Sequence, residues 1–329
     1  MNKISIRFFY DNEVRAVWDD ESSRWWFSVV DIVGVLSQST DARNYWYVLK
    51  SRLKKAGGEA LTNCKGFKLV APDGRRRMAD CLTNDGVIAL AKEFPGKKAN
   101  RFTEWFISSD DTVDGKSKSK AYALFDNSLL DTIEVGTVKG LQQIHGYLFG
   151  GLYDFAGQIR TLNVAKSGFQ FAMARFLPKT LKTIEQMPES TFEEIADKYV
   201  EMNVAHPFME GNGRSARIWL DLILKKRLKL CVDWSMIEKK DYLSAMKKSV
   251  ADPTHIKSLL QNALTDKIDD RDAFMKCIDY SYYYEQESDV SETDDTAAVG
   301  AGAATEADNT AESTASAATA GAWDATETD

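Results

Sequence analysis

Twelve residues, HPFMEGNGRSAR from His206 to Arg217, constrain the fold of this chain more than any other segment. A proline disfavours helical geometry in the residue before it, so a helix should not continue through Pro207. We expect one helix to end near Ala205, a loop to follow over 206–211, and a new helix to begin at about Asn212. The segment therefore predicts two helices joined by a short loop.

The start of the second helix should bind an anion. Backbone amides at a helix N-terminus lack partners within the helix, and here they belong to Gly211, Asn212 and Gly213. The helix dipole stabilises an exposed charge by only about 0.3 to 1 kcal/mol, so side chains must hold a polyphosphate. Arg214 and Arg217 share a helix face, and each can make two charge-assisted hydrogen bonds to phosphate oxygens.

Two more side chains complete a site for a nucleotide triphosphate. Glu210 is a hard oxygen ligand of the kind that Mg2+ takes when it bridges two phosphate groups. His206 can accept a proton from a hydroxyl at neutral pH. Taken singly, such a histidine is usually structural and two such arginines usually form a solvated face. Finding His-Pro-Phe, Gly-Asn-Gly-Arg and the final Arg together by composition alone has odds on the order of one in 10^8, so the risk of a chance match is small. The set therefore predicts ATP and Mg2+ chemistry.

HPFMEGNGRSAR resembles the Fic signature, His-Pro-Phe-x-Asp/Glu-Gly-Asn-Gly-Arg-x-x-Arg, at every fixed position, and residues 133–160 are similar to the upstream helices of a bacterial Fic domain. The resemblance implies a protein adenylyltransferase, which moves AMP from ATP to a Tyr, Ser or Thr hydroxyl of a target protein or of itself. Pyrophosphate leaves. It also implies these roles: His206 as general base, Glu210 as Mg2+ ligand, Asn212 with the amides of Gly211 and Gly213 as anion hole, Arg214 on the inner phosphates, and Arg217 on the γ-phosphate.

A short hairpin is expected inside the helical domain. In residues 160–172, RTLNVAKSGFQFA, a Ser-Gly pair lies between short alternating segments. The hairpin resembles the Fic flap, which holds a target segment in extended form beside the base, and main-chain pairing would suit targets without a common motif. The expected docking residues are Lys166, Ser167, Gly168 and Phe169.

Residues 279–286, DYSYYYEQ, resemble the C-terminal inhibitory helix of the compact Fic class. Ser281 and Glu285 match its Ser/Thr-x-x-x-Glu-Gly/Asn pattern, and Gln286 stands where the pattern has Gly or Asn. A carboxylate at position 285 can pair with Arg217 and take the place of the γ-phosphate. The alternative is an ordinary terminal helix whose tyrosines pack on the core.

The start of the chain predicts an α+β domain over 1–108. Apolar residues alternate in the manner of a small antiparallel sheet, Asp31 and Asp41 fit the N-caps of two helices, and helices should follow at 84–93 and 97–108. Residues 4–107 resemble the Bro-N domain of phage antirepressors. Basic residues there suit a DNA backbone, although a solvated charged face is the alternative; they are Lys50, Arg52, Lys54, Lys55 and Arg75 to Arg77.

Composition divides the rest of the chain. Residues 109–120 have almost no apolar side chains and predict a linker before an all-α domain over 121–286 that carries the β-hairpin flap. Residues 287–329 hold 11 acidic residues and no basic one, and predict a disordered acidic tail. No apolar run is long enough to cross a bilayer and no secretory signal is evident, so we expect a cytoplasmic protein without a membrane partner.

Other functions are also compatible with the sequence. The chain would be a DNA-binding regulator if its Fic half were inactive or served as a sensor. Within the Fic fold, relatives also remove AMP or transfer other phosphate-containing groups. A homo-oligomer is compatible with the sequence, which does not select an oligomeric state.

Overall fold

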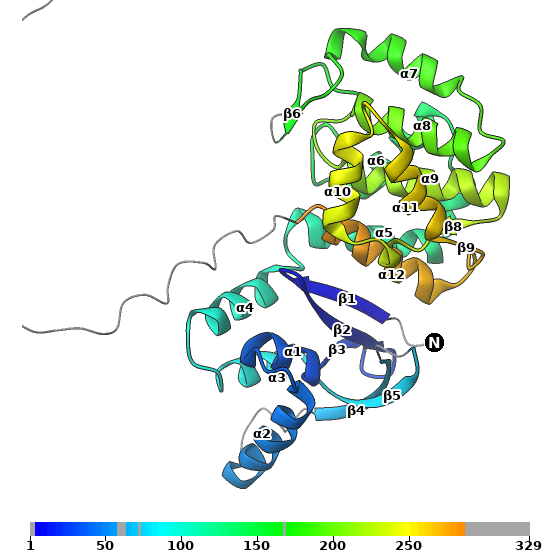
Figure 1. Cartoon of the computed structure of the whole chain (residues 1–329). Helices are drawn as coiled ribbons and strands as arrows, with labels where there is room; N and C mark the ends of the chain where they lie inside the picture. Colours follow the sequence, from blue (N-terminus) through cyan, green and yellow to red (C-terminus); the bar gives the residue numbers. More distant parts are fainter. Residues whose placement is uncertain (1–3, 58–63, 72–73, 167–168, 287–329) are drawn as a thin grey trace, which may run out of the picture. The chain divides into compact units, whose positions relative to one another are not determined.

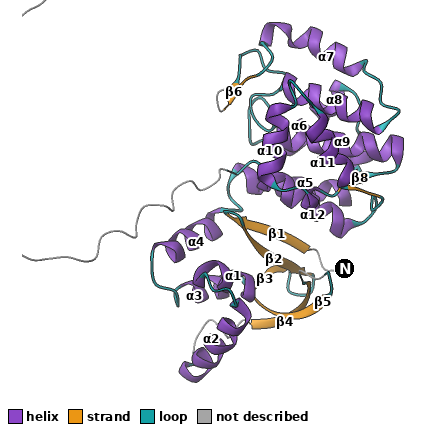
Figure 2. Cartoon of the chain, in the orientation of Figure 1, coloured by secondary structure: helices purple, strands orange, loops and turns teal. Residues whose placement is uncertain are grey.

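The computed structural model describes residues 4–57, 64–71, 74–166 and 169–286 (Figure 1). A sheet-containing N-terminal region is followed by a helical region, and Figure 2 shows the long strands in the former. This order confirms the expected α+β and helical parts of the fold. The expected disordered tail, 287–329, lies outside the described residues.

The N-terminal region is built on a five-stranded antiparallel sheet with the order β1-β2-β3-β5-β4. The strands are β1 (Ile4–Phe9), β2 (Asn12–Asp19), β3 (Arg24–Ser28), β4 (Cys64–Val70) and β5 (Arg76–Leu82). The alternating residues at the start of the chain form β1 and β2 as predicted. The strand order places β1 at an edge of the sheet, where one side of its backbone has no neighbouring strand among the described residues.

Four helices complete this region: α1 (Val29–Ser37), α2 (Ala42–Ala56), α3 (Asn84–Ala91) and α4 (Lys97–Ser108). Fully buried side chains from strands and helices form one hydrophobic cluster, which includes Val14, Phe27, Ile32 and Phe102. Burial of this apolar surface holds the helices on the sheet.

The two predicted N-caps have different outcomes. Asp41 caps α2 as expected, since its side chain accepts a hydrogen bond from the Asn44 amide at 3.0 Å. The prediction for Asp31 was wrong. β3 leads directly into α1, which begins two residues before Asp31, and this carboxylate instead accepts a hydrogen bond from Arg15 Nε at 2.7 Å.

The expected linker includes the start of a helix. α5 (Val113–Asp126) begins within residues 109–120, and the Thr112 side chain caps it by accepting a hydrogen bond from the Gly115 amide at 3.0 Å. Ser117, which carries no apolar signal, is fully buried. Small residues let α5 pack closely, so low apolar content did not mark an unstructured linker here. The domain boundary itself stays a prediction.

The helical region surrounds α9 (Asn212–Leu228). The other long helices are α6 (Val138–Phe149), α7 (Leu177–Glu185), α8 (Phe192–Ala205), α10 (Lys239–Lys248), α11 (Thr254–Asn262) and α12 (Arg271–Tyr283). Trp219 and Ile223 of α9 are fully buried, as predicted for a central helix. Within the described ranges, no helix combines the length and apolar character needed to cross a membrane.

Candidate active site

The loop between α8 and α9 has the predicted boundaries. α8 ends at Ala205, His206 follows with a left-handed backbone (φ 50°), and α9 begins at Asn212. The Asn212 side chain accepts a hydrogen bond from the Phe208 amide and donates one to the Phe208 carbonyl, both at 2.8 Å. This side chain therefore fixes the loop, which leaves the main-chain amide of Asn212 for an anion.

Two glycines are required by their surroundings. Gly211 has φ +82°, and a Cβ there would lie 2.5 Å from the ring of Phe149. A Cβ on Gly213 would collide with the carboxylate of Glu285. The first glycine permits the turn into α9. The second leaves space at the helix N-terminus, and the Glu285 carboxylate lies in that space.

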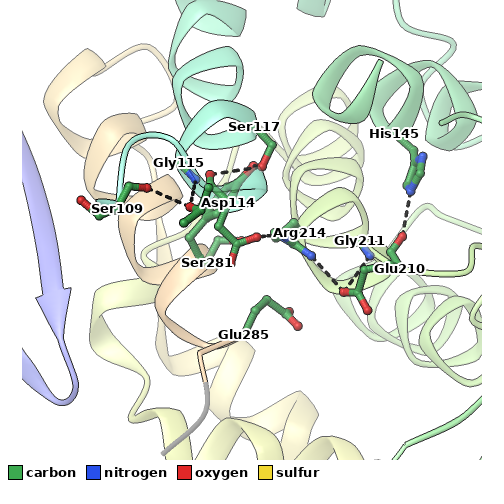
Figure 3. Close-up of polar contacts among 12 residues, drawn as sticks. Ser109, Asp114, Gly115, Ser117, His145, Glu210, Gly211, Arg214, Ser281 and Glu285 are labelled. Carbon is green, nitrogen blue, oxygen red and sulfur yellow. Dashed lines mark hydrogen bonds and ion pairs between the residues drawn. The ribbon is translucent and has the colours of Figure 1, made fainter. Parts of the chain in front are cut away.

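Figure 3 shows Arg214 between two carboxylates. One amino group donates to Glu210 Oε1 at 2.9 Å, and the other pairs with Asp114 of α5. The Arg214 side chain is only 3% exposed, and its Nε is buried without a hydrogen-bond partner among the described residues. Sequence reasoning missed Asp114, because it lies 100 positions from Arg214 in the segment expected to be a linker.

Arg217 is buried and is held by α12. Its Nε donates to Ser281 Oγ at 2.7 Å, and its NH2 group donates to the Ser281 carbonyl and to Glu285 Oε1, both at 2.6 Å. The two residues predicted from the inhibitory pattern are thus both brought to Arg217. Gln286 follows with its carbonyl bound by Lys239 Nζ at 2.7 Å. Whether this contact inhibits an activity stays a prediction.

The His206 ring lies face to face with Phe171, with ring centroids 3.6 Å apart. Burial lowers the pKa of His206 to about 4, although the Glu285 carboxylate acts in the opposite direction. The imidazole is therefore neutral at pH 7 and has a lone pair that can accept a proton.

Arg160 ties the predicted flap to this loop. Its side chain donates to the carbonyl oxygens of Leu162 and Ala172 at the two ends of the hairpin, and to those of Ala205 and His206. The side chain is almost fully buried. Four carbonyl partners satisfy most of its donors. Sequence reasoning missed this role, since two of the partners, Ala205 and His206, lie 45 and 46 positions from Arg160.

The hairpin itself consists of β6 (Ala165–Lys166) and β7 (Phe169–Gln170), which pair antiparallel. Phe169 lies edge-on to Phe171, with centroids 5.1 Å apart. Ser167 and Gly168 lie outside the described residues, as does the side chain of Lys166. The docking role of these four residues stays a prediction.

His145 of α6 positions the loop through the main chain of Glu210 (Figure 3). Its Nδ1 accepts a hydrogen bond from the Gly157 amide at 2.8 Å, so Nε2 carries the proton and donates to the Glu210 carbonyl at 2.9 Å. Burial lowers the pKa of His145 to about 4, which keeps this neutral form. In the sequence, His145 was only one member of a helical pattern.

Replacing His145 by Phe should lower the free energy of unfolding by about 1 to 3 kcal/mol, because the Gly157 amide and the Glu210 carbonyl lose their partner in the interior. Phe keeps an aromatic ring against Phe208. His255→Phe is the control, since His255 is exposed, and it should change stability by less than about 0.5 kcal/mol. Urea unfolding measures both, and equal midpoints would contradict the positioning role.

Glu210 suits a magnesium ion that is held mainly by phosphates and water. The Glu210 side chain is 49% exposed, and its Oε1 accepts from Arg214 and from the Gly211 amide. Its Oε2 makes no hydrogen bond within the described ranges. Those ranges contain no group of three or more His, Cys, Asp or Glu side chains placed to hold a metal. One carboxylate beside a nucleotide is a common ligand set for Mg2+.

Residues 136–224 match the family model described as Fic/DOC family, so the chain contains a Fic/DOC domain. Two of its relatives are named as adenylyltransferases. Protein adenylyltransferase VbhT of Bartonella schoenbuchensis is 28% identical over 140 residues, which are 38% of this chain and 29% of that protein. Probable protein adenylyltransferase Fic of Escherichia coli is 30% identical over 130 residues, 35% of this chain and 64% of that protein. The chain thus spans less than two thirds of either relative.

Solved structures also align with the chain. BepC protein of Bartonella tribocorum, with bound AMPPNP, is 18% identical, with coverage of 52% of this chain and 92% of that chain and a TM-score of 0.39. The N-terminal Fic domain of a Bartonella effector protein from Bartonella sp. AR 15-3 is 18% identical. The alignment covers 47% of this chain and 83% of that chain, with a TM-score of 0.40.

Proposed function

We propose that this chain is an ATP-dependent protein adenylyltransferase, which transfers AMP to a Tyr, Ser or Thr hydroxyl of a target protein or of itself. One observation carries the proposal: at the N-terminus of α9, the buried guanidinium groups of Arg214 and Arg217 are neutralised by carboxylates from other segments. Because the chain's own carboxylates already bind both guanidinium groups, the two arginines are positioned to bind the negative charges of a polyanion. The buried Nε of Arg214 is a donor that a phosphate oxygen would satisfy.

In the proposed reaction, neutral His206 accepts the proton of the target hydroxyl, and the hydroxyl oxygen attacks the α-phosphorus of ATP. A P–O bond forms there as the bond to pyrophosphate breaks. AMP remains as an ester on the target, and the proton leaves His206 for solvent. Arg214 binds the inner phosphates and Arg217 the γ-phosphate. Magnesium, held by Glu210, would neutralise phosphate charge.

The same geometry supports autoinhibition by Glu285. Its carboxylate occupies the N-terminal end of α9 beside Gly213 and pairs with Arg217, the proposed partner of the γ-phosphate. A triphosphate would then bind with its α-phosphate displaced from His206. The hairpin at β6 and β7 would present the target beside that histidine by main-chain pairing.

A DNA-binding role for the Bro-N-like region is the weaker candidate. Several of its expected basic residues are already paired: Lys50 with Asp80 at 2.6 Å, Arg52 with Glu93 at 3.5 Å, and Arg76 with Asp272 at 3.2 Å. These pairs favour a solvated charged face. Filter binding at several salt concentrations tests the role, because phosphate contacts give a steep salt dependence.

The proposed base makes a specific pH profile expected. Its lowered pKa means that His206 stays deprotonated until the pH falls to about 4. For Glu285→Gly, kcat/KM should therefore show no titration of this group between about pH 5.5 and 8. Loss of Glu285 lowers the pKa of His206 further, so the direction is unchanged. A midpoint near the ordinary histidine value of about 6.5 would contradict the buried environment of His206.

The function is tested most broadly by mass spectrometry of a lysate incubated with ATP and the Glu285→Gly variant. The expected result is the mass of AMP on a Tyr, Ser or Thr residue. The same spectrum identifies the acceptor protein. A different added mass, such as a single phosphate, would assign another transferred group to the site.

A further inference from the structure

The helix that carries Ser281 next to Arg217 is also bound by the N-terminal sheet. The main-chain amide of Ile6, in edge strand β1, donates to Asp279 Oδ2 of α12 at 2.6 Å. Asp279 is 1% exposed. Its other oxygen accepts a hydrogen bond from Tyr122 OH of α5 and lies 3.3 Å from Lys118 Nζ. α12 thus satisfies an amide of the sheet edge through a buried carboxylate.

Aromatic side chains extend this contact toward Glu285. Phe8 of β1 stacks on Tyr283 with centroids 4.1 Å apart and an angle of 13°, and lies edge-on to Tyr280 at 5.1 Å. The Tyr283 hydroxyl donates to Asp11 Oδ1 at 2.7 Å. Tyr283 is two residues before Glu285, so the last turn of α12 is fixed by the sheet next to the carboxylate that binds Arg217.

The position of α12 depends on these contacts for two reasons. A helix of 13 residues is only marginally stable without tertiary packing. Separation from β1 would also remove the Ile6 amide from Asp279 and expose Phe8, which is 5% exposed in this structure. Each contact that holds α12 on β1 therefore also favours the arrangement in which Glu285 pairs with Arg217.

We propose that the N-terminal sheet is the regulator of the site: β1 holds α12 so that Glu285 stays on Arg217, and a partner that separates β1 from α12 activates transfer. This inference rests on the proposed adenylyltransferase function. It assigns a role to the N-terminal region that requires no nucleic acid.

Two variants weaken this interface from opposite sides. Phe8→Ala removes the ring that β1 contributes to the stacked pair. Tyr283→Ala removes the ring that α12 contributes, without changing the core of the sheet. Each should raise AMP incorporation roughly tenfold, the upper range for loss of an aromatic pair. When either variant is combined with Glu285→Gly, AMP incorporation should stay at the level of Glu285→Gly alone, because both variants act through Glu285. Phe67→Ala is the control, since Phe67 is buried in the same sheet against Trp26 rather than α12.

Amide hydrogen exchange across α12 gives a readout that needs no activity. Both interface variants should exchange faster over 271–283 than wild type, and Phe67→Ala should not. Unchanged exchange and unchanged incorporation in Tyr283→Ala would overturn the proposal. If Glu285→Gly transfers no AMP while exchange still rises in Tyr283→Ala, the adenylyltransferase function fails and the structural hold of β1 on α12 stands. If Tyr283→Ala still activates in the Glu285→Gly background, coupling through Glu285 is excluded.

Discussion

Glu285→Gly should raise AMP incorporation about 100-fold, because holding an enzyme 99% inactive requires only about 2.7 kcal/mol. The partly buried pair of Glu285 with Arg217, at 2.6 Å, can supply that difference together with the packing of α12. Without the carboxylate, Arg217 keeps Ser281 as a partner and becomes available to the γ-phosphate. Incorporation of label from ATP into protein measures the effect.

A matched control is Glu238→Gly. Glu238 is exposed at the N-cap of α10 and its side chain makes no capping hydrogen bond, so glycine there should cost only a few tenths of a kcal/mol. Its incorporation should equal that of wild type. ATP should also raise the melting temperature of Glu285→Gly more than that of wild type, since the nucleotide replaces the lost charge on Arg217. Equal labelling by wild type and Glu285→Gly would eliminate the inhibitory switch.

His206→Ala in the Glu285→Gly background should lower incorporation by about 10^2- to 10^4-fold, the usual range for loss of a general base. ATP affinity should be retained, because the proposed phosphate ligands lie on α9. His206 has φ 50°, a left-handed backbone that alanine adopts reluctantly, so His206→Asn is a needed second variant. His255→Ala controls for the loss of a histidine elsewhere. An active His206→Asn enzyme would remove His206 from the mechanism.

The local geometry of the site was largely predictable because its determinants are local. Pro207 ends α8, and the glycines around Asn212 belong to the turn into α9. The apolar spacing of α9 marked it correctly as a central helix. Ser281 and Glu285 were found because they form a short sequence pattern, with Ser281 in α12 and Glu285 two residues beyond its end.

The supporting residues could not be predicted because their determinants are not local. Asp114, His145 and Arg160 act through partners in other segments, and neither periodicity nor composition reports such pairing. The N-terminus of α5 shows a related failure. Its small polar residues suggested a linker, whereas close packing requires small side chains there: a Cβ on Gly115 would collide with the backbone of Ser109.

The most direct test of the central claim uses ATP labelled separately at the α- and γ-phosphorus. With Glu285→Gly, protein should retain the α-label and lose the γ-label as pyrophosphate, and the double variant with His206→Asn should retain neither. Retention of the γ-label would indicate phosphoryl transfer. The absence of both labels from protein incubated with Glu285→Gly, ATP and Mg2+ would contradict AMP transfer at the N-terminus of α9.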